Sequence, residues 1–199
     1  MKILKYVLFA VLALVVLFFA VGIFTPVVNY GTEITANKPL QEAWAVTQDE
    51  SKYDQWLEGF KSMELIEGEK GQPGSKHKVI VEPSDGQPEF EMIETLVALE
   101  EFKYVDMHFD SETMDFEQKI FYNESEGKTT IRSESKVIAK NIVTRSLFAL
   151  MEKLGGAFTA QEKKNFEALK KLIEENTTDY YPAPAVSEAE EAATMEDSE

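Results

Sequence analysis

Three titratable side chains in one short segment are the first candidates for chemistry. Asp106, His108 and Asp110 form an Asp-x-His-x-Asp pattern, and carboxylates beside an imidazole are groups that transfer protons in enzymes. The residues between them are apolar, and the two sets alternate with the period of a β-strand. The pattern therefore indicates the solvent-exposed face of a strand rather than a catalytic site.

The remaining histidine and a glutamate in the following strand are the second candidates. His77 shares a strand face with Val79 and Val81 near the start of its strand, which predicts a position at the rim of the fold rather than the role of a base. Glu94 can face either way, because both faces of its strand are apolar. We therefore predict no catalytic residue, although the sequence leaves enzyme activity undecided.

Metal and cofactor chemistry is limited by the composition. The chain contains no cysteine, which excludes disulfides, thiol catalysis and thiolate-bound metals. It has no His-x-x-x-His pair and no acidic loop of the calcium-binding type. The glycine-rich stretch Gly68 to Gly74 lacks the lysine and the helix that complete a phosphate-binding loop. We expect no metal and no cofactor.

Polar residues on the inner side of the sheet are more informative. If residues 114–123 and 129–139 pair as a hairpin, Glu117 faces Lys136 outside and Gln118 lies beside Ser135 inside. A buried polar group needs a protein partner, a water molecule or a ligand. Small and polar residues on the concave face would therefore leave space beneath the sheet.

The longest helical pattern outside the N-terminus, Arg145 to Asn176, predicts the helix that packs against this sheet. One apolar arc of its helical wheel contains Met151, Leu154, Phe158, Leu169, Leu172 and Ile173. Gly155, Glu162 and Asn165 fall on the same side, where a core helix would carry apolar residues. Either the helix breaks at Gly155-Gly156, which we favour, or a hollow that tolerates these residues lies beneath it.

The rest of the domain is predicted to consist of strands and short helices. Seven segments have strand patterns: 27–36, 60–66, 76–82, 90–99, 103–111, 114–123 and 129–139. Short helices at 40–47 and 51–57 follow the first strand, with Asn37 and Ser51 as their caps. The later strands are joined by turns without helices, which indicates an antiparallel meander. The predicted fold class is α+β: a seven-stranded antiparallel sheet curved around one long C-terminal helix.

An apolar run of 22 residues, Ile3 to Phe24, opens the chain. It is long enough to cross a hydrocarbon core about 30 Å thick. A cleaved secretory signal is the alternative, because Ala20-Val21-Gly22 loosely resembles a cleavage site, but the run exceeds the usual h-region. We therefore expect an uncleaved transmembrane anchor over residues 1–25. Lys2 and Lys5 at its start predict a single-pass protein with a cytoplasmic N-terminus and an extracytoplasmic domain.

The chain as a whole is strongly acidic. Its formal net charge is −16, from 36 acidic and 20 basic side chains, and such a surface repels phosphate backbones and anionic headgroups. Nucleic acid is therefore not an expected partner. Residues 177–199 contain seven acidic side chains and no basic one, so we predict a disordered acidic tail there.

The order of these elements resembles the helix-grip fold. Local sequences agree with it: I-T-A-N-K-P-L-Q-E-A-W from Ile34 to Trp44, Y-D-Q-W from Tyr53 to Trp56, G-x-x-G-x-P-G-S from Gly68 to Ser75, and F-x-x-L-x-x-L from Phe166 to Leu172. Over residues 27–176 the chain is similar to the START-related, polyketide cyclase/dehydrase-like superfamily, often labelled SRPBCC. The anchor and the tail lie outside this resemblance.

The resemblance implies a cavity between sheet and long helix that accepts an apolar ligand. Its implied wall consists of Trp56, Phe60, Met107, Phe109, Phe116, Gln118, Ile120, Ser133, Ser135, Met151, Phe158 and Glu162. The expected function is a membrane-anchored binding or transport domain for a lipid or other apolar small molecule. The alternative is a non-catalytic structural or protein-interaction module of the cell envelope, which a closed interior well under about 300 Å³ would favour.

Overall fold

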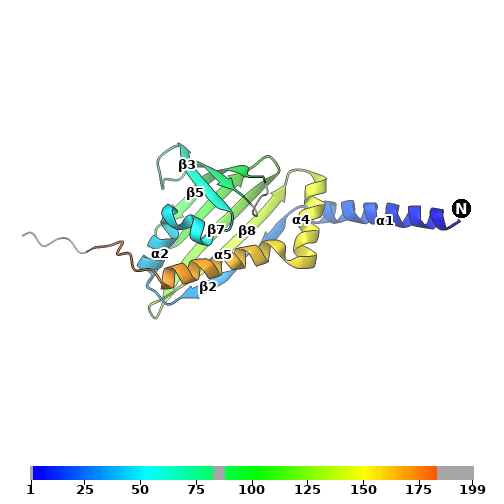
Figure 1. Cartoon of the computed structure of the whole chain (residues 1–199). Helices are drawn as coiled ribbons and strands as arrows, with labels where there is room; N and C mark the ends of the chain where they lie inside the picture. The colour runs from blue at the N-terminus through cyan, green and yellow to red at the C-terminus, as the bar shows by residue number, and fades with distance from the viewer. Residues whose placement is uncertain (1, 83–87, 183–199) are drawn as a thin grey trace, which may run out of the picture.

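The computed structural model of the chain describes residues 2–82 and 88–182. Figure 1 shows a curved sheet, helix α5 lying along it, and helix α1 projecting from one end. The elements are α1 (Lys2–Phe24), β1 (Val28–Tyr30), β2 (Glu33–Ala36), α2 (Leu40–Gln48), η1 (Glu50–Lys52), α3 (Tyr53–Trp56), β3 (Phe60–Glu67), β4 (Lys76–Val81), β5 (Phe90–Glu100), β6 (Tyr104–Asp110), β7 (Met114–Ser125), β8 (Lys128–Ala139), α4 (Ile142–Gly155) and α5 (Ala157–Glu174).

In the described parts of the chain, eight strands form one antiparallel sheet. The order is β1-β8-β7-β6-β5-β4-β3, with β2 also paired to β8. The run from β3 to β8 is therefore the predicted meander. The predicted β7–β8 register is confirmed, because Glu117 lies opposite Lys136 and Gln118 opposite Ser135. Lys136 and Glu117 form an ion pair of 3.1 Å on the outer face, which leaves Gln118 on the inner one.

The single first strand predicted over residues 27–36 is two strands. Gly31 passes so close to β8 that a Cβ atom there would lie 2.4 Å from the carbonyl oxygen of Ser133. The next N–H, that of Thr32, donates to the side-chain Oγ of Ser133 at 3.0 Å. This side-chain bond interrupts the regular ladder. The sheet consequently has eight strands where the alternation pattern predicts seven.

Two predicted helix caps are also wrong. Asn37 does not cap α2, because its side-chain Nδ2 donates to Glu174 at the end of α5 at 2.9 Å. The N-terminus of η1 is capped by Asp49, whose Oδ1 accepts the N–H of Ser51 at 3.1 Å. The predicted helix 51–57 is thus one 3₁₀ turn followed by the single turn of α3. Asn37 instead ties the strand end to the C-terminal helix.

The predicted long C-terminal helix is divided at Gly156. This residue has φ 58° and ψ 37°, a left-handed conformation that suits glycine and commonly ends a helix. The break that we favoured is therefore present. It turns α4 away from the line of α5, so Leu154, which the wheel placed in the buried arc, is 84% exposed. The predicted hollow is present as well, beneath Glu162.

We expect Gly156→Ala to lower the free energy of unfolding by about 1–2 kcal/mol, the cost of a left-handed conformation at a residue with a Cβ. Gly155→Ala is the matched control. A Cβ at Gly155 meets no atom within 4 Å, and alanine favours the helical conformation of this residue. Urea unfolding of the full chain in detergent micelles measures both variants. Equal stabilities would show that the turn does not require glycine.

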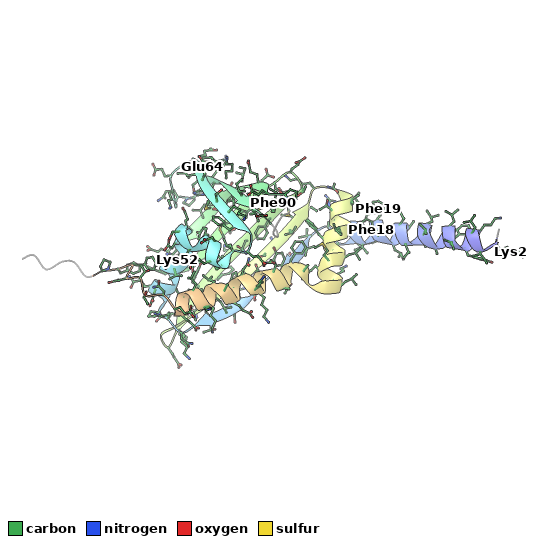
Figure 2. All side chains as sticks on the ribbon, in the orientation of Figure 1. Lys2, Phe18, Phe19, Lys52, Glu64 and Phe90 are labelled. Carbon is green, nitrogen blue, oxygen red and sulfur yellow. The ribbon has the colours of Figure 1, made fainter. Side chains whose placement is uncertain are left out.

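Helix α1 leaves the domain beside α4. Gly22 is buried there, and a Cβ atom on it would lie 2.3 Å from Ser146 Oγ, so the two helices cross in close contact. Lys153 Nζ of α4 donates to Thr25 Oγ1 at 2.7 Å. Residues 2–17 are all exposed, and Figure 2 shows Lys2 at the far end of the projecting helix. By length and composition, α1 is able to cross a membrane.

The structure describes the first six residues of the predicted acidic tail, 177–182. Within this segment Tyr180 is half-buried, and its Oη donates to Asp49 Oδ2 at 2.7 Å, while residues 177–179, 181 and 182 are exposed. Lys52 Nζ lies 5.0 Å from the centre of the Tyr180 ring. Tyr180 therefore packs against the domain, four residues past the predicted domain end at 176. The rest of the predicted tail, 183–199, lies outside the described residues.

Candidate ligand-binding site

A cavity of about 750 Å³ lies between the sheet and α5. Its wall is formed by inward side chains of β3 to β7, by one face of α5, and by η1 and α3. The predicted wall residues that line it are Trp56, Phe60, Met107, Phe109, Phe116, Gln118, Ile120, Met151, Phe158 and Glu162. Most of these side chains are apolar, so the cavity suits a ligand that is mainly hydrocarbon.

Ser133 and Ser135, predicted as wall residues, do not line the cavity. The Oγ of Ser133 accepts the N–H of Thr32 at 3.0 Å, at the break between β1 and β2. Ser135 donates its hydroxyl to Glu162 and is covered by that side chain. Both serines are buried, and their hydroxyl groups are bonded to protein groups, Ser133 to Thr32 and Ser135 to Glu162.

Aromatic rings form one continuous part of the wall. Phe109 and Phe116 stack with ring centres 5.1 Å apart, and Tyr30 lies 6.4 Å from Phe116 and 5.5 Å from Phe158. Phe158 in turn contacts Phe148 of α4, with centres 5.2 Å apart. Such contacts stabilise the wall beyond the effect of burial. The row of rings leads from the middle of the sheet to α4.

A polar group inside the cavity is built around Glu162. Glu162 is 5% exposed, and its Oε1 accepts hydrogen bonds from Gln118 Nε2 at 3.0 Å and from Ser135 Oγ. Its Oε2 is buried without a protein partner. Burial, together with the negative charges of Glu162 and Glu152, raises the pKa of Tyr30, so this phenol stays protonated and able to donate. The Oε2 of Glu162 is thus a hydrogen-bond acceptor that remains available to a bound molecule.

The second polar group is the pair His77 and Glu94. These residues lie opposite each other on β4 and β5, and His77 Nδ1 is 3.6 Å from Glu94 Oε1, too long for a direct hydrogen bond. The prediction of a rim position for His77 is wrong, because the side chain is only 6% exposed. Glu50 of η1 and Lys70 of the β3–β4 turn form an ion pair of 2.8 Å and line the same cavity.

The interior changes the protonation of this pair. Burial, and to a smaller extent the charge of Glu50, raises the pKa of Glu94 to about 7. Burial lowers the pKa of His77. At neutral pH the imidazole is therefore neutral, and the carboxyl of Glu94 titrates in the neutral range instead of near 4.5. Both nitrogens of His77 and the Nε1 of Trp56 are buried without a protein partner, so donors and acceptors are available to a ligand.

The Asp-x-His-x-Asp pattern lies outside the cavity, as predicted. Met107 and Phe109 line the cavity, and the residues that alternate with them point to the opposite side of the sheet. Asp106 pairs with Lys119 at 3.2 Å, and Asp110 forms an ion pair with Lys140. In residues 2–82 and 88–182, no group of three or more His, Asp or Glu side chains is placed to hold a metal ion.

Solved structures share this architecture. Ara h 8.0201 matches with a TM-score of 0.54 and 18% identity, over 75% of this chain and 99% of that one. TTHA0849 from Thermus thermophilus matches with a TM-score of 0.61 and 10% identity, over 76% and 100% of the two chains. The chain has the helix-grip fold. CV1439 from Chromobacterium violaceum matches the same fold, with a TM-score of 0.56 and 11% identity over 74% and 98%.

These comparisons establish the helix-grip fold. No protein-family model matches the sequence, and no curated protein matches it. The predicted α+β fold class, with an antiparallel sheet curved around a C-terminal helix, is confirmed. The helix-grip matches cover nearly all of the neighbouring chains and about three quarters of this one.

Proposed function

We propose that this chain is a membrane-anchored binding domain that takes up a lipid or another apolar small molecule in its helix-grip cavity. The observation that carries the proposal is the cavity volume of about 750 Å³. Small-molecule sites commonly measure about 300–1,000 Å³. A volume well under about 300 Å³ would favour a protein-interaction module without a ligand. The observed volume is well above that limit.

The ligand that fits best is amphiphilic and uncharged. Its hydrocarbon part would lie against the aromatic row and the apolar side chains of the sheet. Its hydroxyl, amide or carbonyl groups would pair with the free polar atoms of Trp56, His77 and Glu162, which otherwise remain buried and unsatisfied. An anion is disfavoured, because Glu162 and Glu94 are acidic groups inside the cavity.

The anchor in this proposal is α1. Its 23 residues extend over about 34 Å at 1.5 Å per residue, which is enough to cross the hydrocarbon core of a bilayer. Lys2 and Lys5 lie at the end far from the domain, and the positive-inside rule then puts that end in the cytoplasm. The domain would lie on the extracytoplasmic side, where an envelope protein could also reach it.

Native mass spectrometry of the full chain, released from membranes in mild detergent, tests the proposal. The expected result is a fraction of molecules that carries one additional lipid-sized mass. Lipid classes that bind should also raise the unfolding temperature, because a ligand that binds only the folded state stabilises it. Protein that never retains a mass and is shifted by no lipid class would favour the protein-interaction module.

A double variant that fills the cavity provides a direct check. Val79→Trp with Val105→Trp introduces two indoles from β4 and β6 into the space. The affinity for a fluorescent fatty alcohol should fall at least about 100-fold, a change of about 2.7 kcal/mol. Val97→Trp is the control, because Val97 is on the exposed outer side of β5 and should leave binding unchanged. Full binding by a folded double variant would place the ligand elsewhere.

A further inference from the structure

Helix α4 carries an apolar face that nothing in the described domain covers. Val143, Leu147 and Met151 are 43–53% exposed, and Leu154 is 84% exposed. Their spacing of four, four and three residues places them along one side of the helix. The opposite side is packed, since Ser146 and Ala149 are fully buried. The helix is therefore amphipathic, with its apolar side in contact with solvent.

The position of α4 points to the occupant of this face. Figure 1 shows α4 running across the end of the domain from which α1 projects, and Figure 2 places Phe18 and Phe19 of α1 next to it. The contact between the helices is at Gly22 and Ser146. Gly22 follows Lys2 by 20 residues, or about 30 Å of helix. That length equals the thickness of the hydrocarbon core, so an α1 that spans the membrane would hold α4 at the level of the bilayer surface.

The charges of α4 agree with this position. The helix contains Arg145 and Lys153 and one acid, Glu152, in a chain whose formal charge is −16. The carboxylate of Glu152 accepts the N–H of Phe158 at 2.9 Å, so it is used within the protein. Lys153 flanks the apolar face and donates to Thr25 Oγ1 of α1 at 2.7 Å, whereas Arg145 lies on the packed side, where its Nε donates to the carbonyl oxygen of Ala139 at 2.9 Å. A basic residue that flanks an apolar face is typical of helices that lie in the headgroup region.

We infer that α4 lies in the surface of the bilayer that α1 spans, with Val143, Leu147, Met151 and Leu154 inserted among the lipids. This inference rests on the proposed anchor function of α1. It adds a second membrane contact, which holds the domain against the lipid surface instead of leaving it on a free tether. Met151 also lines the cavity, so the inserted face and the wall of the cavity share a residue.

Single-cysteine labelling tests the inference, and the chain has no native cysteine to interfere. Leu154→Cys, Val97→Cys and Leu12→Cys each receive an environment-sensitive nitrobenzoxadiazole dye in the full chain. The proteins are reconstituted into vesicles of phosphatidylcholine with a minor fraction of phosphatidylglycerol. Lipids with a nitroxide near the headgroup or deep in the acyl chain then quench the dyes.

The expected result is at least twofold stronger quenching at residue 154 than at residue 97, with the shallow nitroxide more effective than the deep one. Residue 12 should be quenched best by the deep nitroxide, which reports the insertion of α1. Quenching at 12 without quenching at 154 would overturn the inference alone. A blue-shifted but unquenched dye at 154 would also overturn it, in favour of a contact between α4 and another copy of this chain. Absence of quenching at residue 12 would overturn the anchor itself.

Discussion

Glu94→Gln is expected to raise the stability of the domain by about 3 kcal/mol at pH 8 and to leave it unchanged near pH 4. The pKa of Glu94 rises from 4.5 to about 7 on folding, so the folded state binds this proton more tightly than the unfolded chain does. The stability that results is present below pH 4.5 and is lost as the pH rises through 7. Each pKa unit corresponds to about 1.4 kcal/mol, and glutamine resembles the neutral acid.

For His77→Gln, the difference in stability between the variant and the parent chain should change with pH in the opposite direction. Burial lowers the pKa of His77, so the unfolded chain takes up the proton first as the pH falls. The stability linked to this group is present above pH 6.5, the value typical of histidine, and is lost in acid. The variant should therefore be more stable than the parent chain at pH 5 and equal to it at pH 8.

Thermal unfolding of the full chain in detergent micelles from pH 4 to pH 8 measures both curves. Subtracting the parent curve removes the contributions of the surface carboxylates, which both proteins share. Glu91→Gln on the same strand is the control, because Glu91 points to the other side of β5 from the wall residues Phe90 and Met92. Parallel curves for the parent and the Glu94 variant would show that Glu94 titrates in the fold as it does in the unfolded chain.

Glu162→Leu is expected to weaken ligand binding by about 10-fold to 100-fold, because it removes the free acceptor Oε2 from the cavity. The same variant should keep its stability or gain about 1–2 kcal/mol, since a buried acid is costly to desolvate. Its two partners are not left alone, because Gln118 Nε2 also donates to Ser135 Oγ at 3.2 Å. Stability and binding are thus expected to change in different directions.

Titration with a fluorescent fatty alcohol, paired with urea unfolding, separates the two effects. Glu167→Leu removes an exposed glutamate from the same helix and should change neither quantity. A loss of several kcal/mol in the Glu162 variant would identify the carboxylate as a structural group that holds α5 to the sheet. Unchanged affinity in a stable variant would mean that the ligand does not reach this end of the cavity.

The sheet could be predicted from the sequence because its register is local. Short turns join β5 to β8, and the alternation of Gln118 and Ser135 with charged neighbours allows one pairing only. The first strand could not be predicted in the same way. Its break depends on Gly31 approaching Ser133, about 100 residues later in the chain, and a strand pattern contains no information about such a contact.

The interior of the site was only partly predictable for a related reason. Strand alternation correctly puts Gln118 inside and the helical wheel puts Glu162 there, but neither pattern reports depth. His77 is buried because η1 and the β3–β4 turn close over it, where Glu50 pairs with Lys70. That closure is a contact between separate segments. The side on which Glu94 lies is ambiguous in the sequence because apolar residues occur on both faces of β5, and only the packing of the folded sheet decides which face is internal.

The direction of α4 likewise follows from contacts that a helical wheel omits. The Gly155-Gly156 pair signals a break, but the turn angle is set by Gly156 and by the packing of Gly22 on Ser146. Leu154 is therefore assigned to the core by the wheel and is exposed in the fold. In a single long helix, Leu154 would have been buried with the apolar side of α5, and α4 would have had no separate apolar face for the membrane.

The shared position of Met151 has a kinetic consequence. If Met151 borders both the inserted face and the cavity, an apolar ligand can pass from the bilayer leaflet into the protein through a continuous apolar path. Such a ligand never has to dissolve in water as a monomer. Loading would then follow the local composition of the leaflet and would be insensitive to how slowly that ligand desorbs. Long-chain and short-chain homologues, whose aqueous solubilities differ by orders of magnitude, should then load at similar rates.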